Sequence, residues 1–245
     1  MGLQRPRVVA WMLHCLLLLA ASGWACAENE EPPAATRGAG ERAQSAAASH
    51  VNDAVDVVRM AAQEPGMGTL FSQARGVFIV PAYGRAALGI GASGGAGVLS
   101  LRRKSGAWSY PAFFSIGTLS VGGQAGAEGG SMVLLLMNDK AIAGFKHKNK
   151  FTLSADAGLT VFNWSAMAQG TVGAGDVIAW ATAKGLFGNI VSVALDDVHF
   201  NQRLTQDYYD RPATVRDILA GKVWNQQADP LREALSVASG ATVIK

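Results

Sequence analysis

Apolar residues recur at helical spacing between Ala47 and Gln63. Val51, Val55 and Val58 follow one another at intervals of four and three residues, which places them on one face of a helix. Pro65-Gly66 comes directly after this segment, and such a pair is typical of a helix end. The pattern therefore predicts a helix with one buried face, and the apolar spacing after it predicts a second, shorter helix from Met67 to Ala74.

From Gly76 to Asn138 the pattern changes to short apolar runs separated by glycine, which is typical of antiparallel strands. From Leu88 to Gly91 glycine alternates with larger residues, so one strand face lacks side chains and a helix, another backbone or a ligand can approach it. The predicted strands are Val77 to Val80, Ala86 to Ile90, Gly97 to Leu101, Trp108 to Phe114, Thr118 to Val121 and Met132 to Met137.

The remainder of the chain mixes helical and strand patterns, with helices concentrated at the end. The order of helix, many strands and helix predicts an α+β fold, with a Gly-rich, largely antiparallel sheet or barrel-like core flanked by N- and C-terminal helices. A helical turn is predicted at Asp139 to Phe145, strands at Phe151 to Leu153, Leu159 to Phe162, Val177 to Ala181 and Ile190 to Leu195, and helices at Asn201 to Tyr209, Thr214 to Ala220 and Pro230 to Ala238.

The first residues have the pattern of a secretory signal. Arg5 and Arg7 precede an apolar run from Val8 to Ala21, and Ala25-Cys26-Ala27 offers small residues at the positions that a signal peptidase reads. We expect a signal peptide at 1–27, a flexible leader at 28–44 and a single domain at 45–245. The alternative is a lipoprotein acylated at Cys26.

Composition narrows the classes of function. With 49% apolar and 16% charged residues, and 29 glycines without a three-residue period, the chain is neither disordered nor collagen-like. Removal of the signal takes two of the 21 basic residues and none of the 18 acidic ones, so the net charge falls from +3 to 19 minus 18, or +1. This balance argues against a nucleic-acid partner. Removal of the signal also takes away both cysteines, so no structural disulfide is expected.

Three motifs suggest other chemistry, and each lacks the context that this chemistry needs. Gly89 to Gly94 matches a dinucleotide-binding pattern, and the overlapping Ser93 motif matches a nucleophile elbow, yet no helix is predicted after either. Asp196, Asp197 and His199 could hold a cation, but no further ligand cluster accompanies them. We therefore expect no catalytic residue, no metal and no cofactor.

Two basic clusters are the better candidates for a binding site. Both follow or separate apolar segments, as expected where an anionic lipid headgroup meets its acyl region, although solubility of loop tips predicts the same composition. The clusters consist of Arg102, Arg103 and Lys104, and of Lys146, Lys148 and Lys150.

Several ordered motifs together resemble the SYLF lipid-binding domain family, over roughly residues 45 to 222. They are Ala74-Arg75-Gly76-Val77, Gly94-Gly95-Ala96-Gly97-Val98, Trp108-Ser109-Tyr110-Pro111, Gly123-Gln124-Ala125-Gly126, Ala183-Lys184-Gly185-Leu186-Phe187 and Tyr208-Tyr209. The resemblance implies a non-enzymatic phospholipid-binding module. It also adds Lys184 as a candidate contact.

Eukaryotic members of this family are tied to phosphoinositide membranes and actin, whereas the signal peptide makes this chain similar to the exported bacterial members. We therefore expect a phospholipid or membrane partner and a periplasmic place, with association to the outer membrane as an option. The rival reading is a structural or partner-binding envelope protein without a lipid ligand. It would use the same Gly-rich sheet to dock another protein.

Overall fold

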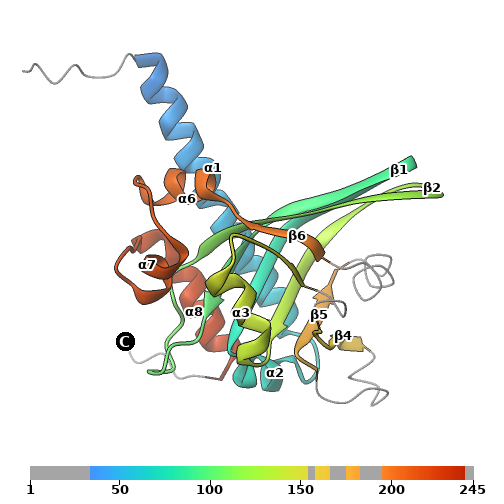
Figure 1. The fold of residues 1–245 in the computed structure, drawn as a ribbon. Coiled ribbons are helices and arrows are strands. Elements are labelled where there is room, and N and C mark those ends of the chain that lie inside the picture. The colour runs from blue at the N-terminus through green and yellow to red at the C-terminus, as the bar shows by residue number, and fades with distance from the viewer. Residues whose placement is uncertain (1–33, 154–157, 166–174, 183–194, 241–245) are drawn as a thin grey trace, which may run out of the picture.

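The computed structural model describes residues 34–153, 158–165, 175–182 and 195–240, and it has the predicted α+β architecture. Helix α1 (Ala34–Ala62) packs one face against strand β1, helix α6 and helix α8, while its first turns project beyond the body of the molecule (Figure 1). It begins at Ala34 and not at the predicted Ala47, so residues 34–44 are helical where a flexible leader was expected. Helix α2 (Met67–Gln73) follows as predicted.

The predicted short strands between residues 76 and 136 are in fact two long ones. Strand β1 (Gly76–Leu101) pairs with strand β2 (Ala112–Leu136) in antiparallel register along almost their whole length. The glycines that were expected to separate strands lie within β1 and β2 instead. The prediction of six strands in this region was therefore wrong in number, whereas the predicted antiparallel pairing is confirmed.

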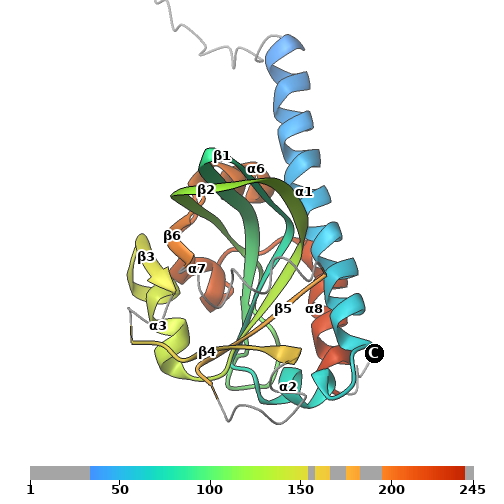
Figure 2. The same cartoon turned by 90° about the vertical axis from the view of Figure 1, so that its right-hand side faces the viewer.

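The ribbon formed by β1 and β2 folds back on itself. A register shift lies between Leu88 and Ile90, and beyond it the second half of β1 returns along the first half, where Arg102 N–H donates to the carbonyl of Arg75 (2.8 Å). Figure 1 shows the bend projecting at the upper right, and Figure 2 shows the same bend as an arch above the other strands.

Glycine permits this close return. A Cβ on Gly97 would lie 2.6 Å from the carbonyl oxygen of Ile79 and 2.7 Å from the ring of Phe78, and one on Gly95 would lie 2.5 Å from the carbonyl oxygen of Ala82. At these two positions another part of the backbone approaches the glycines, so the chain itself fills the space beside them.

The remaining strands extend β2 along its other edge. The sheet has the order β3-β6-β2-β5-β4, with β1 paired to β2. Strand β6 (Leu195–Phe200) pairs with the first half of β2, and β5 (Val177–Ala181) pairs with the second half. Strand β3 (Lys150–Leu153) pairs with β6 in antiparallel fashion, whereas β4 (Val161–Asn163) is parallel to β5.

An aromatic cluster joins the folded ribbon to helix α3 (Asp139–His147). Phe145 of this helix lies with its ring centroid 5.3 Å from that of Phe78, 5.0 Å from Phe114 and 4.7 Å from Phe151. Phe145 is fully buried, as are Phe78 and Phe114. The helix begins where Asn138 accepts a hydrogen bond from the backbone N–H of Ala141 (3.0 Å), which satisfies one free donor of the first turn.

Three further α-helices follow β6, as predicted. They are α6 (Gln202–Tyr209), α7 (Val215–Ala220) and α8 (Asp229–Ala238), with a short 3-10 helix, η1 (Gln226–Ala228), before α8. Helix α7 starts at Thr214, whose hydroxyl accepts from the N–H of Asp217 (3.2 Å), and ends at Gly221 with φ +76°. A left-handed end of this kind favours glycine.

His50 ties α1 to the folded ribbon, and its burial makes this contact sensitive to pH. Its Nε2–H donates to the carbonyl of Ala96 in β1 (2.8 Å). Burial lowers the pKa of His50 from its usual 6.5, against smaller raising effects of Ala96 and Asp53. The folded state therefore binds this proton less readily than the unfolded state, and its stability falls as the pH drops below 6.5.

We expect His50→Gln to lose less stability than the wild type when the pH is lowered, because the glutamine amide donates the same bond without titrating. Urea unfolding at a series of pH values measures the difference. Parallel pH dependence in the two proteins would contradict the assignment.

Candidate functional site

The first basic cluster lies in the connection between β1 and β2. The connection closes as a tight turn, in which Arg103 N–H donates to the carbonyl of Ala107 (2.8 Å) and Gly106 N–H donates to that of Arg103 (2.9 Å). Gly106 has φ +85°, which favours glycine. The structure gives each of the three consecutive cations a different environment.

Arg102 is engaged by the protein itself. Its Nε donates to the carbonyl of Ala74 (3.1 Å) and its Nη2 to that of Phe71 (2.8 Å), both at the end of α2. Its Cζ also lies 4.5 Å from the ring centroid of the buried Trp108. These contacts satisfy carbonyls that a helix end otherwise leaves without a donor. Arg102 thus fixes α2 to the turn.

Arg103 packs against Gly221, the glycine that ends α7. A Cβ at Gly221 would lie 2.5 Å from its Nη2, so a side chain at this position would displace the guanidinium. Within the described part of the chain, Nε and Nη2 of Arg103 are buried without a hydrogen-bond partner. Its Cζ lies 5.9 Å from the ring centroid of Tyr110. Arg103 is held by packing, whereas Lys104 beside it is exposed.

The second basic cluster lies at the end of α3 and the start of β3. Lys146 occupies the last turn of α3, where a cation favours the helix dipole, and it is exposed, as is Lys148. Lys150 is also exposed, but its Nζ lies 3.0 Å from Oδ2 of Asp197. The hydrogen bond from Lys150 and a weaker one from His199 hold the pKa of Asp197 below its usual value.

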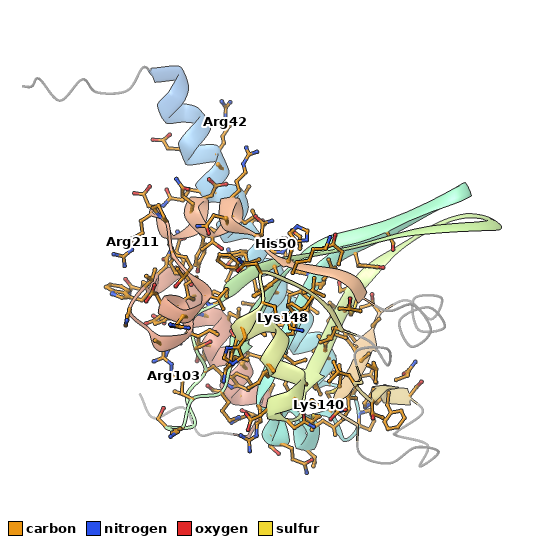
Figure 3. All side chains as sticks on the ribbon, in the orientation of Figure 1. Arg42, His50, Arg103, Lys140, Lys148 and Arg211 are labelled. Atoms are coloured by element: carbon orange, nitrogen blue, oxygen red, sulfur yellow. The ribbon has the colours of Figure 1, made fainter. Side chains whose placement is uncertain are left out.

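Helix α7 lies next to the elements that carry both clusters. This helix packs against α3, whose last turn begins the second cluster, and its terminal Gly221 contacts Arg103 of the first. Figure 3 labels one member of each, Arg103 and Lys148. Lys184 and Cys26 lie outside the described residues, so their placement adds nothing to the site.

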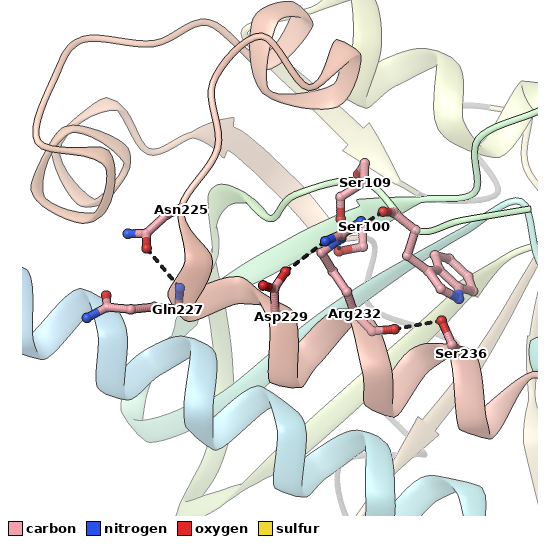
Figure 4. A network of polar contacts seen from close by, with 8 residues as sticks. Ser100, Ser109, Asn225, Gln227, Asp229, Arg232 and Ser236 are labelled. Carbon is pink, nitrogen blue, oxygen red and sulfur yellow. Dashed lines mark hydrogen bonds and ion pairs between the residues drawn. The ribbon is translucent and has the colours of Figure 1, made fainter. Parts of the chain in front are cut away.

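Residues far along the chain complete the surroundings of the first cluster. Arg232 of α8 donates from Nε to the carbonyl of Trp108 (3.1 Å) and from Nη1 to Oδ1 of Asp229 (2.8 Å), and its Cζ lies 4.5 Å from the ring centroid of Tyr110. Figure 4 shows Arg232 reaching from α8 toward Ser100 and Ser109. No local spacing in the sequence relates Arg232 of α8 to this turn, so the contact could not be predicted from the sequence.

The segment Trp108 to Pro111 has structural roles throughout. The Ser109 hydroxyl accepts from the N–H of Leu101 (3.0 Å) and donates to the carbonyl of Tyr110 (3.0 Å). The hydroxyl of Tyr209 donates to the carbonyl of Pro111 (2.8 Å), and burial raises the pKa of Tyr209 well above its usual value, so it stays a neutral donor. These hydrogen bonds hold the basic turn in place.

The alternative chemistries do not find their required geometry. Ser93 lies inside β1 and is followed by more strand, whereas a nucleophile elbow and a dinucleotide fold both need a helix there. Asp197 faces Lys150 and His199, with His199 Nδ1 3.1 Å from its Oδ1. Among the described residues, no three His, Cys, Asp or Glu side chains gather as metal ligands.

None of the described helices has the length and apolar character needed to cross a bilayer.

Comparison with known proteins gives a consistent match. A family model described as "Ysc84: Las17-binding protein actin regulator" matches residues 117–238. "SH3 domain-containing YSC84-like protein 1" of Bos taurus is 26% identical over 170 residues, which are 68% of this chain and 49% of the relative. The Mus musculus protein of the same name is 26% identical over 171 residues, 68% of this chain and 50% of the relative. The chain thus spans about half the length of these relatives, and no solved structure matches it significantly.

Proposed function

Since the chain belongs to the Ysc84, or SYLF, family, we propose that it is a non-enzymatic phospholipid-binding protein, exported to a bacterial cell envelope. In this proposal residues 1–27 are removed as a signal peptide and the domain acts in the periplasm, where it meets the surface of a membrane. The observation that supports the proposal is the exposure of Lys104 in the first cluster and of Lys146 and Lys148 in the second, on elements that both contact α7 or its terminal Gly221. Single surface charge pairs are weak, so neighbouring clusters are what an anionic lipid surface requires.

The relatives' names point to a second candidate from another class. The family description names a protein that binds Las17 and regulates actin, and both Las17 and actin are proteins. A protein partner in the envelope would use the same exposed surface without a lipid. Vesicle binding and the lipid content of the purified protein distinguish a lipid ligand from a protein ligand.

The exposed cations of both clusters are expected to set the affinity for anionic vesicles. Changing Lys104, Lys146 and Lys148 to Gln should weaken binding to phosphatidylglycerol vesicles about 100-fold, because each cation near an anionic surface contributes about 1 kcal/mol. Co-sedimentation with vesicles measures the change, and the difference should shrink at high salt. Arg102 and Lys150 are left intact because both already have partners within the protein.

A matched control removes three exposed cations elsewhere. Arg42 on α1, Arg203 on α6 and Arg211 after α6 are exposed, and changing them to Gln gives the same loss of net charge at residues that belong to neither cluster. Equal weakening by the two triple variants would mean that net charge and not a site attracts the vesicle. Absence of lipid in an organic extract of gently purified protein, with a co-purifying protein instead, would favour the partner-binding alternative.

A further inference from the structure

The loop between α7 and η1 presents an exposed tryptophan. Trp224 exposes 60% of its surface, and its two neighbours are fixed. Val223 is buried, and Asn225 donates from Nδ2 to the carbonyl of Tyr208 (2.7 Å) while its Oδ1 accepts from the N–H of Gln227 (2.9 Å). The indole is thus held outward by an anchored backbone. Because the loop is rigid, the apolar surface of this indole is removed from water only when a ligand or partner covers it.

The first residue of this loop, Gly221, contacts the basic turn between β1 and β2. Gly221 contacts the Arg103 guanidinium, and Lys222, the next residue, has a side chain that is 71% exposed. Lys222 lies 3.4 Å from Oδ1 of Asp217, a surface pair that contributes little to stability. Lys104 follows Arg103 and is exposed. Three cations and one exposed indole therefore occupy two adjoining loops.

We propose that these loops form the surface that enters the headgroup layer of an anionic phospholipid bilayer. This Trp224 surface consists of Arg103, Lys104, Lys222 and Trp224. The proposal rests on the proposed function and specifies its site. The indole has an apolar body and a polar N–H, which suits the boundary between headgroups and acyl chains, and the cations around it are complementary to lipid phosphates.

The second cluster lacks this combination at the residues that flank it. Phe145 is 1% exposed and Phe151 is 8% exposed, so the aromatic residues beside Lys146, Lys148 and Lys150 face the core. Lys150 is paired with Asp197. The second cluster therefore supplies long-range attraction to the membrane, while the Trp224 surface makes the contact.

Arg103 is the cation of this surface with the most to gain from a phosphate. In the described structure its Nε and Nη2 have no acceptor, and burying donors in this state costs free energy. Turning the guanidinium outward breaks no hydrogen bond of these two nitrogens. A phosphate oxygen would then supply the acceptor that the protein does not.

The test compares Trp224→Ala with the wild type in binding to phosphatidylglycerol vesicles. We expect about tenfold weaker binding, with unchanged thermal stability, since Trp224 is exposed. Val237 on α8 is the control, because it is an apolar residue that is 63% exposed and does not belong to the Trp224 surface. Val237→Ala should bind as the wild type does.

A second measurement reads the position of the indole directly. Vesicles of phosphatidylglycerol brominated near the headgroup end of the acyl chain should quench part of the wild-type tryptophan fluorescence, and Trp224→Phe should lose that quenched part. The assignment of the Trp224 surface is overturned if the wild type binds vesicles, Trp224→Ala binds them equally well and Trp224→Phe keeps the full quenching. In that case the proposed function still stands. No binding of the wild type to any vesicle overturns both.

Discussion

Replacing Gly97 by alanine is expected to lower the free energy of unfolding by about 3 kcal/mol. The added methyl carbon would lie 2.6 Å from the carbonyl oxygen of Ile79 and 2.7 Å from Cε2 of Phe78. Neither neighbour can move aside cheaply. Ile79 O belongs to the backbone of the first half of β1, and the Phe78 ring is packed against Phe114 and Phe145. The substitution forces apart the two halves of the folded ribbon.

Gly84 provides the matched control on the same strand. A Cβ there meets nothing within 4 Å, and Gly84 is exposed. Gly84→Ala should leave stability unchanged or raise it slightly, because alanine loses less backbone entropy than glycine on folding. Urea unfolding followed by circular dichroism measures both variants. Equal stability of Gly97→Ala and Gly84→Ala would contradict the close return of β1 on itself.

Arg102→Gln is expected to destabilise the protein by about 3 kcal/mol, although it belongs to a cluster with the composition of a binding site. The substitution removes two charge-assisted hydrogen bonds, to the carbonyls of Ala74 and Phe71, and the stacking of the guanidinium on Trp108. The end of α2 would then keep buried carbonyls without donors. Chemical unfolding measures the loss of stability.

Lys104→Gln is the comparison for this prediction, since it removes the same charge two residues along the turn. Lys104 is exposed, so its substitution should change the free energy of unfolding by less than about 0.5 kcal/mol. Folded Arg102→Gln should also bind anionic vesicles nearly as the wild type does. A stable Arg102→Gln protein with weakened vesicle binding would instead make Arg102 a lipid contact.

Much of the helical structure was predictable because its signals are local. The buried face of α1 follows from valines three and four residues apart, and Asn138, Asn201 and Thr214 begin α3, α6 and α7 by accepting backbone hydrogen bonds. The start of α1 was missed, since the residues near Ala34 have no apolar period to reveal a helix. The strand at Val177–Ala181 was predicted with its full extent.

The candidate site was predictable only as a set of charges. Arg102, Arg103 and Lys104 are adjacent and similar in chemistry, yet one holds a helix end, one packs on Gly221 and one is exposed. Lys222, Trp224 and Arg232 were missed because they lie more than a hundred residues along the chain from the turn that they adjoin. A tryptophan in a polar segment between two predicted helices was the available signal for Trp224.

By itself, the sequence determined the α+β class, the helices, the apolar segments that form strands and the family resemblance, because spacing, capping residues and ordered motifs are properties of neighbouring positions. Only the tertiary structure decided that β1 and β2 are continuous and folded back, and which cations remain available for a ligand. The physical reason is that a glycine permits close approach of a helix, a strand or a ligand alike, and an arginine donates to whichever acceptor the fold brings near. Contacts between segments distant in the sequence decide which group approaches the glycine and which acceptor the arginine meets.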